Sequence, residues 1–348
     1  MNFSNITNVN DGFLGNSDLY GGLNNSVLGN FTQTTEPCED VWCVIQTICI
    51  VIITVLIILT NLMDIAVIYL SFDTFDAPEY FMLSLAFADL GVGILVTPFS
   101  ILPSYYQRWL YGLEWCSVTA TVAAILCSVS IYSLMLISVD RYLNIMYPLH
   151  SLRLITKSRC MAAIAVTWIL SLVVHVVNKI VVNKYYFDDR SYICSIDFPN
   201  QPTFTITLTA TVVAPPMVII CFVYVRIFCI ATRHRAKLNE LRQLSSQAPQ
   251  ASATVSMRLT SAWKSVKMYV FIIGGFCFAW IPYSLLNLVL CTTDLQVPKL
   301  LGFIILWNAM ANSFWNTIIY FLMHKKYREG CNKILEYVTS RHRITDHR

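Results

Sequence analysis

Residues 116–148 read CSVTATVAAILCSVSIYSLMLISVDRYLNIMYP, an apolar run that ends in a charged pair shortly before its proline. If the run is helical, Arg141 lies about 37 Å from Cys116 and about 27 Å from Ala123 along the axis. Ser130 lies about 16 Å from Arg141, and all three separations are near whole numbers of turns, so the four side chains share one face. A charged pair is costly at the end of a helix of hydrocarbon length, which makes it a candidate functional site. The alternative is an interfacial pair that only anchors the helix.

The composition is that of a chain embedded in a membrane. Of its 348 residues, 56% are hydrophobic and only 13% are charged, and the mean hydropathy is +0.58. Such values exclude an ordinary soluble globular protein. Apolar runs of spanning length recur at residues 42–70, 79–103, 113–147, 158–178, 202–233, 261–290 and 298–323. Because the alternating pattern of a β-barrel is absent, the predicted fold class is an all-α membrane protein, a seven-transmembrane helix bundle.

Basic residues set the predicted orientation. The segments after helices three, five and seven are rich in Lys and Arg, whereas the basic residues assigned to the outside are Arg108, Lys179, Lys184, Arg190 and Lys299. The positive-inside rule then places the N-terminus outside a multi-pass plasma-membrane protein and the C-terminus in the cytoplasm. The predicted domains are a disordered, glycosylated extracellular tail at 1–40, the seven-helix domain at 41–323, and a short amphipathic eighth helix with a cytoplasmic tail at 324–348.

The outer side is predicted to carry glycans and a disulfide. N-glycosylation acceptor sequences in the polar tail begin at Asn2, Asn5, Asn24 and Asn30. Cys116 and Cys194 lie at outer helix ends or in the loop that follows helix four, in an oxidising compartment, and are predicted to pair. The sequence leaves open the connectivity of the other outer cysteines, which are Cys38, Cys43 and Cys291.

The centre of the bundle is predicted to be polar. Asp89 lies in the middle of helix two, where a carboxylate needs a partner, a proton or an ion. We expect no other ionisable residue in the helix interiors. Neutral side chains of the kind that binds a small cation beside one carboxylate are Ser130, Asn312, Ser313 and Asn316. We therefore expect Na⁺ as an allosteric ion and no other cofactor, the alternative being a hydrogen-bonded network around a protonated Asp89.

Short motifs occur in order along the predicted helices. They are Asn61, Asp89, the Cys116 and Cys194 pair, Asp140-Arg141-Tyr142 with Pro148-Leu149, Trp168, Pro216 with Tyr224, Phe276-Cys277-Phe278-Ala279-Trp280-Ile281-Pro282, and Asn316 with Tyr320. With these motifs, the chain resembles a rhodopsin-like (class A) G-protein-coupled receptor over nearly its whole length. Ala214-Pro215 and Asn312-Ser313-Phe314 further resemble a small vertebrate orphan subfamily associated with Gs signalling and high basal activity.

The resemblance implies a receptor, not an enzyme, that passes a signal to a heterotrimeric G protein. It implies arrestin, a receptor kinase and membrane lipid as further partners, and no nucleic acid. The residues implied in coupling and activation are Asp140, Arg141, Tyr142, Pro148, Leu149, Tyr224, Trp280, Pro282, Asn316 and Tyr320. The alternative function is a seven-helix transporter or channel, although the chain shows no repeated halves and no charge-lined path.

Two departures from the family pattern bear on signalling. Helix seven reads Asn316-Thr317-Ile318-Ile319-Tyr320, without the proline that the family has at the second position, so its kink should be weaker. At the inner end of helix six, Ala262 stands where the family frequently has an acid that pairs with the helix-three arginine in the resting state. We expect one restraint on the inactive form to be missing.

The predicted ligand pocket lacks charge. Amine receptors of this family hold the ligand's ammonium group with an aspartate at the position of Ala123, and light-sensing members need a lysine in the middle of helix seven, where this chain has only Lys299 at the outer end. We therefore expect a hydrophobic ligand, or a pocket filled by the second outer loop, and interpret His175 as an interfacial or internally hydrogen-bonded residue and not as a ligand contact. The candidate pocket residues are Phe99, Ala123, Cys127, Leu208, Trp280, Tyr283, Ser284, Asn287, Leu306 and Met310.

Overall fold

The computed structural model describes residues 40–71, 77–147, 151, 153–198, 200–244, 249–293, 295–323 and 325–345. Within these ranges, side chains are described except at 71, 228, 231, 234–244, 249–269 and 337–345. The predicted calls that lie outside the described residues are Asn2, Asn5, Asn24, Asn30, Cys38, Pro148 and Leu149. Ala262 lies in a described helix, but its side chain is among those left undescribed.

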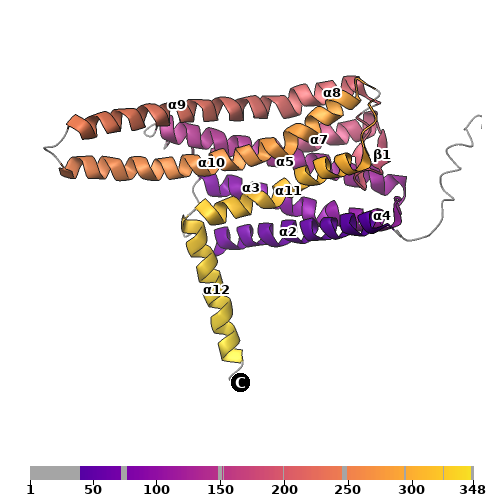
Figure 1. Cartoon of the computed structure of the whole chain (residues 1–348), viewed down its shortest axis with the longest axis horizontal. Coiled ribbons are helices and arrows are strands. Elements are labelled where there is room, and N and C mark those ends of the chain that lie inside the picture. The colour runs from indigo at the N-terminus through magenta and orange to yellow at the C-terminus, as the bar shows by residue number, and fades with distance from the viewer. Residues whose placement is uncertain are drawn as a thin grey trace, which may run out of the picture. The chain divides into compact units, whose positions relative to one another are not determined.

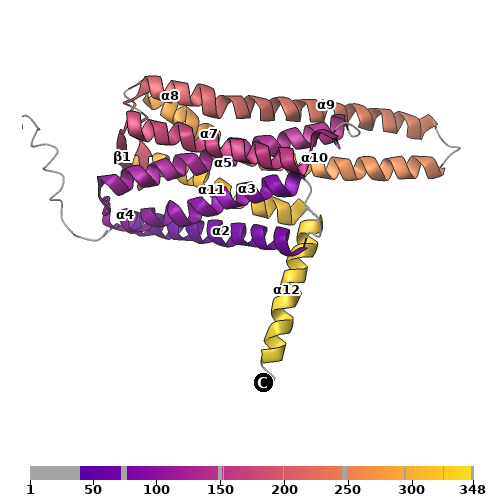
Figure 2. The same cartoon turned by 180° about the vertical axis from the view of Figure 1, so that it is seen from behind.

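The chain folds into long helices that run side by side, as Figure 1 and the view from behind in Figure 2 show. These helices are α2 (Val41–Ser71), α3 (Ala77–Leu95), α5 (Leu113–Met146), α7 (Lys157–Val181), α9 (Ala214–Leu244), α10 (Pro249–Leu290) and α11 (Lys299–Met323). Among the described residues, six segments have both the length and the hydropathy to cross a bilayer. The seventh helix, α11, is 25 residues long and carries Asn308, Asn312 and Asn316 among its apolar residues.

Prolines interrupt two of the spanning segments. Pro98 follows α3, and the chain continues through the 3-10 turn η2 (Thr97–Ser100) into the short helix α4 (Ile101–Tyr106). In the fifth span, α8 (Pro202–Leu208) passes through the π-helical turn η3 (Thr209–Val213) into α9. Because Pro215 and Pro216 lack N–H donors, carbonyls one turn earlier lose their usual partners, and a wider turn accommodates that loss.

α5 forms the centre of the bundle and is a single helix of 34 residues, as the opening run predicts. It packs against α3, α7 and α9 along its length. Its inner half contributes Leu134 and Ile137 to a hydrophobic cluster that also holds Phe276 and Tyr320. Its outer half contributes Val129 to a second cluster, so this one helix connects both halves of the core.

The amphipathic segment near the C-terminus is the helix α12 (Lys325–Thr345), which leaves the end of α11 at a steep angle (Figure 1). At 21 residues it is longer than the short helix expected from the sequence. Its first turn packs against both α2 and α11, and Tyr327 in that turn is completely buried.

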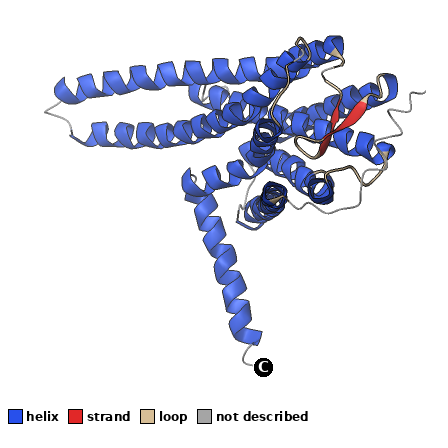
Figure 3. Cartoon of the chain, turned by 45° about the vertical axis from the view of Figure 1, so that its right-hand side comes forward, coloured by secondary structure: helices blue, strands red, loops and turns tan. Residues whose placement is uncertain are grey.

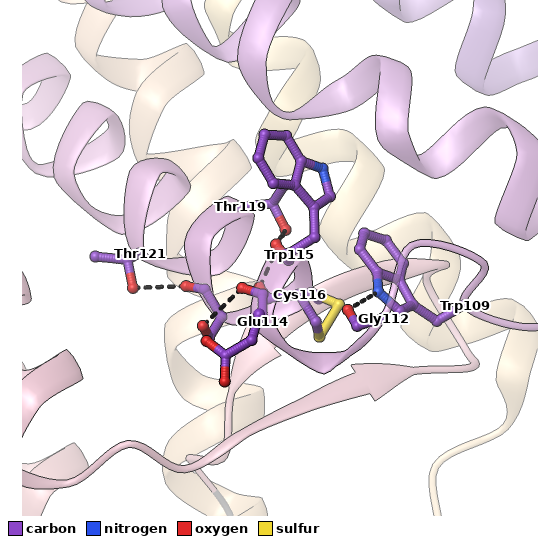
Figure 4. Close-up of a disulfide and its surroundings, with 9 residues drawn as sticks. Trp109, Gly112, Glu114, Trp115, Cys116, Thr119 and Thr121 are labelled. Atoms are coloured by element: carbon purple, nitrogen blue, oxygen red, sulfur yellow. Dashed lines mark hydrogen bonds between the residues drawn. A yellow bond between two sulfur atoms is a disulfide. The ribbon is translucent and has the colours of Figure 1, made fainter.

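A two-stranded antiparallel hairpin lies at one end of the helices (Figure 3). It consists of β1 (Tyr185–Asp188) and β2 (Ile193–Ile196), and we call residues 185–196 the lid hairpin. Cys194 of β2 forms the predicted disulfide with Cys116 of α5 (Figure 4), which defines the outer end of the bundle. Of the other outer cysteines, Cys43 is disulfide-bonded and Cys291 carries a free thiol.

Loss of the disulfide should destabilise the protein. The bond joins cysteines 78 residues apart, and removing a native disulfide typically costs about 2–5 kcal/mol. We expect Cys116→Ser and Cys194→Ser each to reduce surface expression and melting temperature strongly, whereas Cys291→Ser is a matched control because that thiol is unpaired. Parent-like surface level and melting temperature in both disulfide variants would contradict this.

Candidate functional site

The predicted polar centre exists and is built around Asp89. This residue of α3 is 1% exposed, and its carboxylate accepts three hydrogen bonds. Ser130 Oγ of α5 donates to Oδ1 at 2.8 Å, Ser313 Oγ of α11 donates to Oδ1 at 3.0 Å, and Asn316 Nδ2 donates to Oδ2 at 3.2 Å. Asn312 of α11 is also buried, but no described hydrogen bond joins it to Asp89. Three helices therefore meet on one carboxylate.

Two chemical states fit this geometry. The three donors satisfy the carboxylate without an ion, as in a closed hydrogen-bonded network. The hydroxyl oxygens of Ser130 and Ser313 also have lone pairs, so a rotation of each hydroxyl turns the same residues into neutral oxygen ligands beside one carboxylate. That donor set suits a small hard cation.

A second buried carboxylate, Asp64 of α2, corrects the expectation that Asp89 is the only ionisable residue in the helix interiors. Asp64 is 2% exposed and lies one turn after Asn61. The hydroxyl of Thr317 donates to Asp64 Oδ2 at 2.8 Å, and the hydroxyl of Tyr327 donates to Oδ1 at 2.5 Å. An aspartate inside an apolar helix was the signal in the sequence that could have revealed this site.

The contact with Asp64 shows what replaces the family's proline. Thr317 stands at the proline position, and its hydroxyl ties α11 to α2. Tyr327 ties the first turn of α12 to the same carboxylate, and burial together with the neighbouring Asp64 raises the pKa of Tyr327, which keeps its hydroxyl protonated as a donor. Asn61 Nδ2 adds a bond to the backbone oxygen of Ser313 at 2.9 Å. We call Asp64, Thr317 and Tyr327 the inner latch.

Removal of either hydroxyl of the inner latch should loosen α12 and α11. A hydrogen bond to a charged group contributes about 1.5–3 kcal/mol, so Thr317→Val and Tyr327→Phe should each lower the melting temperature of the purified receptor by several degrees. Thr317→Ser keeps the hydroxyl and is the matched control. A double-mutant cycle should show that the two effects are coupled through Asp64. Equal melting temperatures for Thr317→Val and Thr317→Ser would contradict the latch.

The inner end of α5 carries the charged pair. Arg141 Nε lies 3.3 Å from Asp140 Oδ2, and Asn144 donates to Asp140 Oδ1 at 3.1 Å. The Asp140 side chain is 1% exposed, whereas that of Arg141 is 23% exposed. The aspartate is thus held in the core while the guanidinium borders the inner face, so the pair is more than an exposed interfacial anchor.

The other residues implied in activation lie on the path between the pair and the outer half. Tyr224 of α9 and Tyr320 of α11 are buried in the inner cluster. Pro282 lies inside α10, just after Trp280. Trp280 stacks on Phe276 with ring centroids 6.2 Å apart. Tyr142, next to the pair, packs its ring 6.5 Å from that of Phe222.

A cavity of about 830 Å³, which we call the outer cavity, extends from the lid hairpin along α9 as far as Val225. Nine of the ten predicted pocket residues line it: Ala123, Cys127, Leu208, Trp280, Tyr283, Ser284, Asn287, Leu306 and Met310. Among the described residues that line it, none is Asp, Glu, Lys or Arg. The cavity is therefore uncharged, as expected from Ala123.

Phe99 does not line the outer cavity, so its inclusion in the pocket was wrong. The break after α3 carries it into η2, where its ring packs edge-on against Tyr111 at 5.5 Å and against Trp115 at 5.3 Å. Counting along an unbroken helix could not foresee this change of direction.

Of the two interpretations of His175, an interfacial or a hydrogen-bonded residue, the structure supports the second, because it places His175 of α7 in the core. It is 2% exposed and lines the outer cavity. Its Nε2 lies 2.8 Å from Ser128 Oγ of α5, while its Nδ1 is buried with no hydrogen-bond partner among the described residues. A histidine in register with a serine on the central helix was the only sequence signal for this pair.

The lid hairpin closes the outer end and is fixed to several helices. Residues 193–196 and Phe198 line the outer cavity directly. Trp307 of α11 donates to the backbone oxygen of Ser191 at 2.9 Å, and Lys299 forms an exposed ion pair with Asp189 at 2.7 Å. The hairpin approaches α11 so closely that a Cβ at Gly302 would meet Arg190 at 3.1 Å. A side chain at that position would require Arg190 to shift by a few tenths of an ångström.

Polar contacts hold the shape of the lid hairpin and connect it to the neighbouring helices. Asp188 accepts from Arg190 Nε at 2.7 Å and from Ser191 Oγ at 2.5 Å. The hydroxyl of Tyr192 lies within hydrogen-bonding distance of the side-chain oxygens of Gln46 and Gln107. Burial raises the pKa of Tyr192, so its hydroxyl stays neutral and able to donate.

These features together, a seven-helix bundle with a buried aspartate, a charged pair at one end and a disulfide-bound lid at the other, define a class of membrane receptor. A family model described as 7 transmembrane receptor (rhodopsin family) matches residues 60–320. The chain belongs to this family of G-protein-coupled receptors.

Individual relatives narrow the placement. The chain is 32% identical to G-protein coupled receptor 52 of Mus musculus over 304 residues, which cover 86% of this chain and 82% of the relative. It is 31% identical to Probable G-protein coupled receptor 21 of Mus musculus over 295 residues, covering 83% and 82%. The 5-hydroxytryptamine receptor 4 of Cavia porcellus is 29% identical over 269 residues, covering 72% and 69%.

These comparisons make the protein a multi-pass receptor of the plasma membrane whose partner is a heterotrimeric G protein, related to receptors 52 and 21. They give no support to a transporter or channel. The particular G protein and the ligand are matters of inference from the site.

Proposed function

We propose that this receptor activates Gs and does so measurably without added ligand. The observation that carries the proposal is the Asp140–Arg141 pair, buried on its acidic side and open on its basic side at the inner end of α5. An arginine held in this way is available to a G protein once α10 moves outward. The resemblance to the Gs-associated orphan subfamily supports the choice of Gs.

Basal activity follows from a missing restraint. Position 262 of α10, where the family frequently has an acid that pairs with the helix-three arginine in the resting form, is alanine in this chain. A partly exposed ion pair contributes about 0.2–1 kcal/mol, and about 1.4 kcal/mol is a factor of ten in a two-state equilibrium. Its loss therefore raises the active fraction by up to about fivefold.

The remaining partners follow from the same orientation. We infer an extracellular N-terminus, with arrestin and a receptor kinase acting on the cytoplasmic face and lipid against α12, whose first turns carry Lys325, Lys326 and Arg328. Such a basic amphipathic helix suits an anionic leaflet. Any sugar on the four N-terminal acceptor sites would then be extracellular.

The ligand inferred for the outer cavity is hydrophobic and carries no buried cationic amine. One relative is named for 5-hydroxytryptamine, but in this chain Ala123 and the uncharged cavity wall give an ammonium group no counter-ion. An unpaired charge in such a site is strongly disfavoured. Residues of the lid hairpin form part of the cavity wall. We propose that they take the place of a ligand when no other ligand is bound.

Ligand-independent signalling is the direct test of this proposal. Cells expressing the parent chain should accumulate more cAMP than empty cells, and Ala262→Glu should lower this level because the new carboxylate can pair with Arg141. Arg141→Ala should abolish coupling at equal surface expression. A parent indistinguishable from empty cells in Gs, Gi and Gq assays, with surface expression confirmed, would refute basal activity and leave the family assignment intact.

We also propose that Na⁺ binds at Asp89 and favours the resting form. A ligand shifts a two-state equilibrium only by its differential affinity for the two states, so basal cAMP should rise when external and internal Na⁺ is replaced by a large organic cation. Asp89→Asn removes the carboxylate and should abolish this dependence. If signalling in the parent does not respond to Na⁺, the ion-free network of hydrogen bonds is the correct description.

A further inference from the structure

We propose that the outer cavity opens sideways into the bilayer between α9 and α10, and that it takes an uncharged single-chain lipid that carries a hydroxyl group. The inference deepens the proposed function, on which it rests only in treating the outer cavity as a ligand site. It is carried by two observations, a set of lipid-facing residues in the cavity wall and an unpaired nitrogen of His175.

The side opening is shown by residues that line the outer cavity and also face outward. We call them the lipid-facing stripe: Val218, Cys221, Phe222 and Val225 of α9, with Ile281 and Leu285 of α10. Val218 is 66% exposed, Phe222 is 56% exposed and Leu285 is 55% exposed. In a membrane-spanning helix such exposure is to hydrocarbon, so the cavity wall and the lipid surface coincide here.

The stripe has the spacing of one helix face. On α9 its members occupy positions i, i+3, i+4 and i+7, and on α10 positions i and i+4, so each set forms a continuous ridge. The inward-facing neighbours Ile220 and Val223 are almost completely buried. On this side the cavity therefore follows the lipid-facing edge of α9, while its opposite wall is formed by residues of α5 and α11.

The length of the cavity suits an extended chain. It is lined from Leu208 to Val225, 17 residues along one helical segment, which is about 25 Å at 1.5 Å per residue. This approaches the hydrocarbon thickness of a bilayer, about 30 Å. A compact or polar ligand from the aqueous side would leave most of this apolar length unfilled, whereas an acyl chain fills it.

His175 supplies the polar end. Ser128 Oγ lies 2.8 Å from the backbone oxygen of Ala124 and 2.8 Å from His175 Nε2; in the tautomer that lets Ser128 donate to Ala124, Nε2 donates to Ser128 Oγ. In a neutral imidazole the other nitrogen, Nδ1, is then an acceptor. It is buried without a partner among the described residues. Nδ1 is enclosed in the structure although the His175 ring lines the cavity, so a ligand reaches it after the ring turns, and a hydroxyl is the donor that an uncharged lipid then offers.

Charge narrows the class of lipid. Since the described lining includes no Lys or Arg, a phosphate or free carboxylate would enter without a counter-charge. Since it includes no Asp or Glu, a cationic head group is equally disfavoured. A monoacylglycerol-type molecule, with one chain and neutral hydroxyls, satisfies both conditions.

Photolabelling of the full-length receptor in lipid nanodiscs tests the site. The probe is a monoacylglycerol with a diazirine in its acyl chain. We expect saturable labelling of peptides that contain the lipid-facing stripe, competed by unlabelled monoolein and not by lysophosphatidate. Labelling spread evenly over the lipid-facing helices, or insensitive to monoolein, would overturn the proposal.

Two pairs of variants separate the opening from the general lipid surface. Val218→Trp narrows the opening and should reduce specific labelling at least about fivefold, a loss equal to about 1 kcal/mol. Ile219→Trp adds the same bulk to an exposed neighbour outside the cavity and should leave labelling unchanged. Equal labelling of these two variants would overturn the side opening.

The second pair concerns His175. His175→Leu removes the acceptor and should weaken monoolein competition by about fivefold, in line with one neutral hydrogen bond. His175→Asn offers an amide oxygen in its place and should retain part of the affinity. Unchanged competition in His175→Leu would mean that water satisfies Nδ1, and would overturn the polar end of the site.

Signalling measured in parallel keeps this proposal distinct from the proposed function. If basal cAMP is present but specific labelling is absent, the lipid site is wrong and the receptor function stands. If labelling is specific but cAMP equals that of empty cells, the lipid site stands and the constitutive Gs function is wrong.

Discussion

Inside a lipid-immersed bundle, two carboxylates must be satisfied without water, and one helix does this for both. α11 presents Ser313 and Asn316 to Asp89 of α3, and one residue further on presents Thr317 to Asp64 of α2. The consecutive residues Asn316 and Thr317 therefore donate hydrogen bonds to two different helices, α3 and α2. Any rotation of α11 about its axis would break both sets of bonds together, which fixes the register of this helix relative to α2, α3 and α5.

That register determines the rest of the arrangement. In the outer part of α11, Trp307 contacts the lid hairpin, and Leu306 and Met310 line the outer cavity. In its inner part, Tyr320 packs in the hydrophobic cluster that also holds Phe276. The charged pair of α5 lies at the far end of the helix that also supplies Ser130 to Asp89. A ligand that moves Leu306 or Met310 of α11 thus acts on a helix whose position is already set by the buried carboxylates.

The sequence predicted what helical spacing and charge can predict. The single long helix α5, the disulfide between Cys116 and Cys194, the partners Ser130, Ser313 and Asn316 of Asp89, and most of the cavity wall follow from periodicity and family motifs. The position of Phe99 could not be predicted by counting residues along one helix, because α3 ends before Pro98 and the chain changes direction there. Asp64 was overlooked, although it is visible in the sequence as a lone acid in an apolar run. Helical spacing could not predict its partner Tyr327, because that residue lies on α12, which leaves α11 at a steep angle.

The threonine in place of proline changes the mechanics of helix seven. A proline removes one intrahelical hydrogen bond and gives a helix a place to bend, whereas α11 keeps its ladder intact through position 317 and behaves as a stiff rod. Because Thr317 holds α11 to Asp64 near its inner end, the helix tilts as a whole about that contact. A small displacement of its outer end therefore moves its inner end as well. That displacement reaches α12 through two sets of bonds, from Tyr327 to Asp64 and from Arg328 to the backbone oxygens of Phe321 and Leu322, so a tilt of α11 is coupled to the position of α12.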